Sequence, residues 1–246
     1  YPMPAVGLGV YKIADEQMEE VVRTALDAGY RAFDTAYFYG NEKALGSALK
    51  HSNVERDELF ITSKLWNDYQ GYDQTIEYFN KSLDNLGLDY LDLFLIHWPC
   101  ENDQLYIESY KALEHLYEEG KIKAIGVCNF KIHHLEKLMK ETKITPQVNQ
   151  IELHPYFNQQ DVQDFCDEHD IKVTAWMPLM RNKGLLDDPV ITDIAHRYDK
   201  TPAQIVLRWH LAHNRIIIPK SQTPKRIKEN FDIFDFNLEL TDVAEI

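Results

Sequence analysis

Four side chains with complementary proton chemistry are spread along the first part of the chain: Asp34, Tyr39, Lys64 and His97. A free tyrosine has a pKa of about 10, so it is a weak acid at neutral pH. A nearby ammonium favours the phenolate and lowers that pKa, and a carboxylate beside the lysine keeps the ammonium charged and fixed. With a histidine on the same substrate oxygen, this set could protonate a carbonyl as a hydride arrives. A well-placed general acid contributes roughly 10²–10⁴-fold.

Each of these residues also has a purely structural interpretation. A lysine at a strand end often pairs with a carboxylate for stability alone, and His97, between two apolar residues, could be a satisfied core histidine. The stretch DTAYFYGNE holds two phenols, Tyr37 and Tyr39, and does not by itself distinguish them. The chemical interpretation therefore depends on whether the fold brings the four side chains together.

Short apolar runs alternate along the chain with amphipathic segments of helical period, which predicts alternating strands and helices. The eight strand candidates lie at residues 6–10, 31–34, 59–64, 91–97, 122–127, 147–151, 172–176 and 215–218. Two helices are expected between the last two strands, at 188–198 and 202–212, with Thr201 as N-cap and Pro202 at the first helical position.

Eight such units in 246 residues predict an α/β fold of one domain spanning residues 1–246, a (β/α)8 TIM barrel with an extra helix before the last β/α unit. A doubly wound open sheet is the alternative. In a barrel, active residues gather at the C-terminal ends of the strands. Asp34, Lys64, His97 and Trp176 lie at four predicted strand ends, so we expect them on one rim.

Composition narrows the classes of partner. The net charge of −14 disfavours nucleic acid and anionic membranes, and no apolar run of about 18 residues predicts a membrane span. Three cysteines without a C-x-x-C motif indicate a reduced, cytoplasmic chain. The histidines are not spaced to chelate a metal ion, so no metal is expected.

The sequence begins at Tyr1 and stops at Ile246 in a helix start, so we expect an N-terminal start and a C-terminal loop to be missing.

Dinucleotide and phosphate signals are mixed. G-x-G-x-x-G is absent, because Gly7-Leu8-Gly9 lacks the third glycine. A Tyr-x-x-x-Lys pattern, as in short-chain dehydrogenases, occurs twice, at 39–43 and 117–121, and is therefore weak evidence. Four cations cluster in an otherwise acidic chain, where they form either a solvated helix face or a phosphate site: Lys220, Lys225, Arg226 and Lys228.

Seven stretches, in their order, resemble motifs of the aldo-keto reductase superfamily: GLGVYK, DTAYFYGNE, SKLW, LIHWP, IGVCNF, VNQIELHP and IPKSQTPKRIKEN. The resemblance covers essentially the whole chain and implies NADPH-dependent reduction of aldehydes and ketones on a (β/α)8 barrel. Among subgroups, the short loops are similar to those of bacterial 2,5-diketogluconate and methylglyoxal reductases.

The resemblance also implies a role for individual residues. It makes Tyr39 the proton donor, with Lys64 and Asp34 tuning it and His97 orienting the carbonyl. The implied NADPH or NADP+ contacts are Asn129, Gln150, Trp176, Leu179, Lys220, Ser221, Thr223, Arg226, Glu229 and Asn230. The implied walls of the substrate pocket are Tyr11, Trp66 and Trp98.

Three positions depart from the family pattern. Cys128 stands where a serine is usual, and Met177 and Met180 replace a serine and a glycine in the loop after Trp176. A thiol is a weaker hydrogen-bond donor than a hydroxyl, so we expect Cys128 to loosen nicotinamide binding.

We expect a small carbonyl substrate and a monomer. The alternatives are an NADPH-sensing regulatory subunit with little turnover and a short-chain dehydrogenase-type oxidoreductase.

Overall fold

The computed structural model describes all residues 1–246 and forms one eight-stranded parallel sheet in the order β1 to β8. The strands are β1 (Gly7–Gly9), β2 (Ala32–Asp34), β3 (Phe60–Leu65), β4 (Leu91–Ile96), β5 (Ile122–Cys128), β6 (Val148–Glu152), β7 (Lys172–Trp176) and β8 (Ile216–Ile217). All eight predicted strands are confirmed, and no strand end differs from its predicted position by more than one residue.

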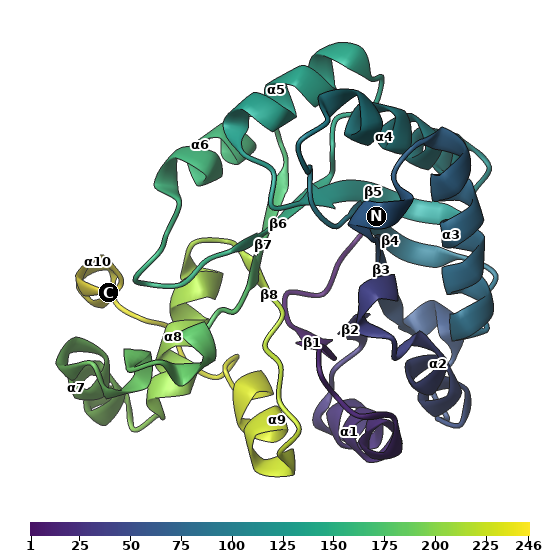
Figure 1. Cartoon of the computed structure of the whole chain (residues 1–246). Coiled ribbons are helices and arrows are strands. Elements are labelled where there is room, and N and C mark those ends of the chain that lie inside the picture. The colour runs from purple at the N-terminus through teal and green to yellow at the C-terminus, as the bar shows by residue number, and fades with distance from the viewer.

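A ring of helices surrounds these strands (Figure 1). The helices are α1 (Asp15–Ala28), α2 (Glu42–Lys50), α3 (Tyr72–Leu86), α4 (Asp103–Glu118), α5 (Ile132–Glu141), α6 (Gln160–Glu168), α7 (Pro189–Tyr198), α8 (Pro202–Ala212), α9 (Pro224–Phe231) and α10 (Leu240–Glu245). None of them is long and apolar enough to cross a bilayer.

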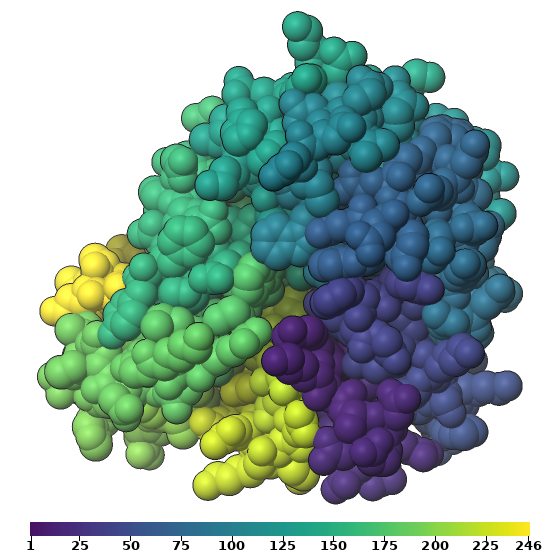
Figure 2. Space-filling model, in the orientation of Figure 1, coloured from purple at the N-terminus to yellow at the C-terminus, as the bar shows by residue number.

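The first and last strands meet and nearly close the sheet into a barrel. Val6 forms a parallel bridge with Ile217, whose N–H donates to Ala5 O at 2.9 Å, and Gly9 N donates to Pro219 O at 3.1 Å. In Figure 2, purple atoms of the N-terminal part lie beside yellow atoms of the C-terminal part of the chain. The closure excludes the doubly wound open sheet and with it the short-chain dehydrogenase alternative.

Side-chain alternation along the strands separates two apolar layers. In β2, Ala32 packs inside the barrel with Phe60 and Val148, whereas Phe33 joins the larger core between the strands and the helices. Gly126 allows β5 and β6 to approach closely, because a Cβ at this position would lie 2.4 Å from Val148 O.

The doubled helix between β7 and β8 is confirmed as α7 and α8. Thr201 Oγ1 accepts from Gln204 N at 3.2 Å, Gln204 Oε1 accepts from Thr201 N at 3.1 Å, and Pro202 occupies the first turn. This reciprocal capping satisfies two amides that the helix leaves free. It fixes the start of α8 beside the C-terminal rim of the barrel.

Candidate active site

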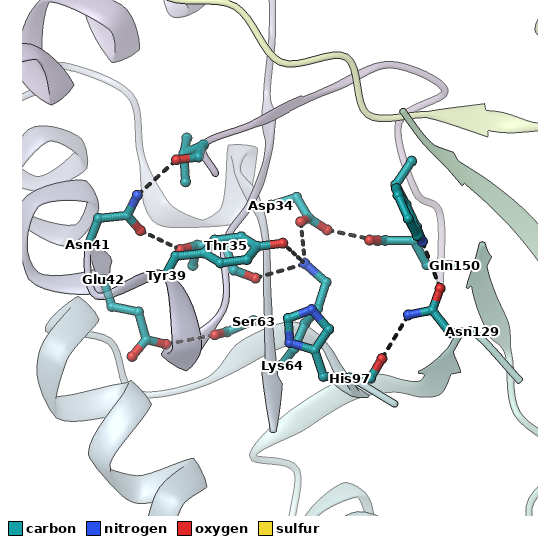
Figure 3. Close-up of polar contacts among 12 residues, drawn as sticks. Asp34, Thr35, Tyr39, Asn41, Glu42, Ser63, Lys64, His97, Asn129 and Gln150 are labelled. Carbon is teal, nitrogen blue, oxygen red and sulfur yellow. Dashed lines mark hydrogen bonds and ion pairs between the residues drawn. The ribbon is translucent and has the colours of Figure 1, made fainter. Parts of the chain in front are cut away.

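The Lys64 ammonium lies at the centre of the predicted proton-transfer set. It forms a short ion pair with the Asp34 carboxylate, donates to Thr35 O at 3.0 Å and contacts the Tyr39 hydroxyl at 3.3 Å (Figure 3). Asp34 and Lys64 are almost completely buried, with 3% and 1% exposure. The barrel therefore brings three side chains from the ends of β2 and β3 into direct contact.

Burial and charge act in opposite directions on this pair. Burial lowers the pKa of Lys64, but Asp34 and Tyr39 more than offset that effect, so the pKa lies above its ordinary value. Burial raises the pKa of Tyr39 and outweighs the lowering by Lys64. The lowering expected from Lys64 is thus present but is not the net result. Tyr39 keeps its proton across the neutral range, as a general acid must.

His97 follows β4 and lies beside Tyr39, with 5.9 Å between the ring centroids. Burial and the Lys64 charge lower the pKa of His97 to about 3, so the imidazole is neutral at physiological pH. Its Nδ1 is buried without a partner in the protein. A neutral imidazole can donate one hydrogen bond to a carbonyl oxygen.

The turn that carries Tyr39 is held by a buried polar network. Residues Tyr37–Tyr39 form a single 3-10 turn, and the next residues open α2. Asn41 does not cap that helix with its side chain. Its amide instead accepts from Thr35 Oγ1 at 2.9 Å and donates to Val10 O at 2.8 Å. The network ties the turn to the chain after β1.

The two tyrosines of the turn have different surroundings. Tyr39 faces Lys64 and His97, and its ring lies 5.0 Å from that of Tyr11. Tyr37 instead packs edge-on against the rings of Tyr69 and Tyr78, at 5.6 Å and 5.3 Å. The geometry therefore distinguishes the two phenols that the sequence stretch left equivalent, and it assigns Tyr37 to packing.

A cavity of about 930 Å³ opens at this rim. It is lined by every sequence-predicted site residue except Lys64, which lies just beneath its wall: Asp34, Tyr39, His97, Asn129, Gln150, Trp176, Leu179, Lys220, Ser221, Thr223, Arg226, Glu229, Asn230, Tyr11, Trp66 and Trp98. Residues at or near the ends of all eight strands thus share one space, as expected for a barrel.

Two amide side chains connect the cavity floor to the catalytic corner. Asn129 Oδ1 accepts from the Trp176 indole at 2.9 Å, and Asn129 Nδ2 donates to His97 O at 2.9 Å. Gln150 Nε2 donates to Asp34 Oδ2 at 2.9 Å (Figure 3). Each amide keeps hydrogen-bonding capacity for a ligand, because an amide group offers two N–H donors and two lone pairs.

The far end of the cavity is polar and basic. Lys220 and Ser221 follow β8, and Thr223 is the N-cap of α9, where helix N–H groups favour an anion. Arg226 also lines the cavity, whereas the exposed Lys225 and Lys228 of the same cluster do not. Glu229 accepts from Thr201 Oγ1 at 2.6 Å, which ties α9 to the start of α8.

Sequence reasoning missed several residues of the cavity wall, and three of them have large side chains that face the site: Lys12, Phe38 and Arg181. The Lys12 ammonium and the Arg181 guanidinium lie 5.4 Å and 5.8 Å from the Tyr11 ring centroid. Neither pairs with a carboxylate, and nor does Lys220. Arg181 could have been found from its place in the loop after β7, since such loops form barrel active sites.

Two of the three departures from the family pattern lie on this wall. Cys128 is buried in the cavity lining, and burial raises the pKa of its thiol, so the group stays protonated. Met177 lines the cavity and has a left-handed backbone with φ of 51°. Met180 does not line it.

Comparison with known proteins decides the family. A profile of the Aldo/keto reductase family matches residues 5–246. This chain belongs to the aldo/keto reductase family. It is 49% identical over 245 residues to methylglyoxal reductase DkgA of Escherichia coli O157:H7 and 50% identical over 245 residues to glyoxal reductase of Bacillus subtilis. In both cases the match covers 99% of this chain and 88% of the relative.

Solved structures of similar proteins superpose closely on the barrel. An aldo/keto reductase from Brucella melitensis has a TM-score of 0.96 at 49% identity, covering 99% of this chain and 93% of that one. A Gox0644 variant in complex with NADPH has a TM-score of 0.94 at 44% identity, covering 98% and 88%. The chain is accordingly an oxidoreductase that uses NADP(H), in agreement with the resemblance seen in its sequence.

Proposed function

We propose that this reductase converts small aldehydes and ketones to alcohols, with α-oxoaldehydes such as methylglyoxal and glyoxal as its first candidates, and with Tyr39 as the general acid. The substrate class follows the names of two relatives. The observation that carries the mechanism is the Tyr39 hydroxyl, 3.3 Å from the Lys64 ammonium and facing the cavity beside a neutral His97.

The cavity has the donors that NADPH needs. Three unpaired cations face it along one side, and they match the phosphate groups of that cofactor better than a neutral ligand: Lys12, Arg181 and Lys220. In this proposal Lys220, Ser221, Thr223 and Arg226 hold the 2′-phosphate, which favours NADPH over NADH. Glu229 and Asn230 contact the adenine.

The nicotinamide end would lie over Trp176, with Asn129 and Gln150 holding the carboxamide and Leu179 packing beside them. Asn129 is fixed by two partners and Gln150 by one, and each amide still has a free N–H and a free lone pair for the carboxamide. When bound, NADPH supplies the hydride. The residues of the chain then orient the carbonyl and deliver the proton.

Tyr39 and His97 converge on one position, where the carbonyl oxygen would lie. His97 donates one hydrogen bond to that oxygen and thereby sets the carbonyl direction. As negative charge develops on the oxygen, Tyr39 transfers its proton, and the adjacent Lys64 ammonium stabilises the phenolate that forms. Asp34 keeps the ammonium charged and in place.

Aromatic side chains limit the size of the substrate. Phe38 stacks on Trp66 with 3.8 Å between ring centroids, and Trp66 lies 5.3 Å from the His97 ring. Tyr11 and the half-exposed Trp98 complete this wall. Such a partly apolar entrance with two convergent polar groups suits a short carbonyl compound.

A steady-state panel of aldehydes, ketones and ketoses, each with NADPH and with NADH, tests the proposal. We expect NADPH oxidation with methylglyoxal, glyoxal and 4-nitrobenzaldehyde, and much weaker activity with NADH. NADPH binding without oxidation above background on any carbonyl would contradict the proposal and favour the regulatory-sensor alternative.

A further inference from the structure

His210 is a completely buried histidine that the proposed chemistry does not use. It lies in the last turn of α8, outside the cavity lining, and its Nε2 is 3.0 Å from Pro178 O. Its Nδ1 accepts from Arg215 Nε at 3.2 Å. Because a guanidinium only donates, Nδ1 must be the acceptor nitrogen, and Nε2 carries the proton that is donated to the Pro178 carbonyl.

Arg215 is itself fixed on the far side of His210. Its side chain is 3% exposed, Nη1 donates to Gln163 Oε1 at 2.7 Å, and the guanidinium lies 4.4 Å from the Trp209 ring centroid. Burial lowers its pKa to about 10, so it remains charged at neutral pH. No carboxylate forms an ion pair with it, although the charge of Asp167 acts on it from a longer distance and raises its pKa. Burial of a charge without an ion-pair partner is unfavourable, so this arrangement is poorly explained by stability alone.

The Pro178 carbonyl belongs to the cavity wall. Pro178 lies between Met177 and Leu179 in the loop after β7, and all three line the cavity directly after Trp176. Proline has no N–H, and no backbone amide donates to Pro178 O. Met177 has φ of 51°, a region that non-glycine residues rarely adopt. The flanking carbonyls of Met177 and Leu179 accept from backbone N–H groups, whereas the Pro178 carbonyl is held by the His210 side chain.

We propose that His210, oriented by Arg215, is a positioning residue for the cofactor: by anchoring the Pro178 carbonyl from outside the cavity, it fixes the loop that presents Trp176 and Leu179. The role rests on the proposed NADPH site. A wall that is ordered before binding loses less conformational freedom on binding, which strengthens affinity without any direct contact to the ligand.

Substitutions at His210 separate anchoring from simple packing. His210→Gln keeps both functions, because a glutamine amide can donate to Pro178 O and accept from Arg215. His210→Leu fills a similar volume and removes both bonds. His210→Asn can still accept from Arg215, but its shorter side chain does not reach Pro178 O. It therefore removes the anchor alone, and it replaces His210→Leu in the test if the leucine variant does not fold.

The readouts are the Kd for NADPH, the KM for methylglyoxal at saturating NADPH, and hydrogen exchange of residues 177–183 without cofactor. We expect His210→Leu or His210→Asn to weaken NADPH binding about tenfold, or about 1.4 kcal/mol, and to speed exchange in the loop. The carbonyl KM should change less than about twofold, and His210→Gln should match the wild type within about threefold.

Folded His210→Leu or His210→Asn protein with wild-type NADPH affinity and wild-type exchange would overturn the anchoring role. Equal loss of affinity in His210→Gln and His210→Leu would overturn it as well. Failure of the wild-type protein to bind NADPH would instead refute the proposed function. In that case, unchanged exchange in His210→Leu would still refute the anchor, because that measurement uses no cofactor.

Discussion

The proposed catalytic corner (Asp34, Tyr39, Lys64 and His97) and the proposed phosphate-binding arm (Lys12, Arg181 and Lys220) each contain a central lysine, but the two lysines have opposite surroundings. Lys64 is buried and contacts a carboxylate, a carbonyl oxygen and a phenol. Lys220 is exposed, and its pKa is lowered by partial burial and by the nearby Arg181 and Lys12 charges. In the corner, each charged group has a partner within the protein. In the arm, the three cations have no carboxylate partner, so an anionic ligand would neutralise them.

This difference divides the expected effects of substitution. Changes in the corner should alter turnover and folding stability, because its groups are partners of one another. Changes in the arm should alter cofactor affinity and leave turnover at saturating cofactor intact. Substitutions in each region can test this difference, and the largest effect is expected at Lys64.

Lys64→Met should lower kcat by about 10²-fold or more, because Tyr39 loses the charge that stabilises its phenolate. It should also lower the free energy of unfolding by about 3 kcal/mol, since the Asp34 carboxylate is left buried and unpaired. Steady-state kinetics and denaturant unfolding measure the two effects. The matched control is Asp34→Asn combined with Lys64→Met, which should recover part of the stability and none of the activity. Near-normal kcat in the single variant would break the comparison.

Lys220→Met should weaken NADPH binding by about tenfold or more through loss of a charge-assisted contact, with NADH binding and kcat at saturating NADPH nearly unchanged. Titration of intrinsic fluorescence with each cofactor gives both constants. Lys225→Met is the control, because this exposed lysine of α9 lies outside the cavity lining. An equal loss of NADPH affinity in the two variants would show a general charge effect and not a phosphate site.

Trp176→Phe should lower kcat/KM by about fivefold, because a ring remains but the indole N–H that fixes Asn129 is lost. Asn129 would then hold His97 less firmly through its remaining bond. The control is Trp98→Phe, a similar change at the half-exposed rim, whose side chain has no such partner in the corner. Larger loss in Trp98→Phe than in Trp176→Phe would contradict the importance of this connection.

The smallest expected effect is that of pH on the reduction. His97 is neutral above a pKa of about 3, and the pKa of Tyr39 is raised, so kcat/KM should be nearly level between about pH 5 and about pH 9. The free energy of unfolding should depend on pH, unlike the rate. His97 takes up a proton near pH 6.5 in the unfolded chain but only at about pH 3 in the folded protein. The free energy of unfolding therefore falls as pH decreases through this window. A titration of kcat/KM near pH 6.5 would contradict a neutral His97.

The barrel, and the place of the proposed catalytic residues on one rim of it, could be predicted from the sequence because the signals are local and repeated. A short apolar run marks each strand, and Asp34, Lys64 and His97 each lie at or beside a strand end that a barrel must place on one rim. The N-cap Thr201 and first-turn Pro202 defined the start of α8 correctly.

What could not be predicted depends on contacts between distant segments. The net direction of the Tyr39 pKa depends on its burial, which spacing does not reveal. The bond from Trp176 to Asn129 joins two strands, and Asn129 adopts a left-handed backbone with φ of 63° to make it. Arg181 reaches Tyr11 only because the loop after β7 folds back over the cavity.

The most direct test of the central claim compares Tyr39→Phe with Tyr37→Phe, the same substitution two residues apart in the same turn. Each variant is assayed for methylglyoxal reduction and for NADPH affinity. We predict that Tyr39→Phe lowers kcat by about 10²–10⁴-fold with NADPH affinity unchanged, while Tyr37→Phe keeps wild-type turnover within about twofold. Turnover near the wild-type rate in Tyr39→Phe would contradict its role as the proton donor.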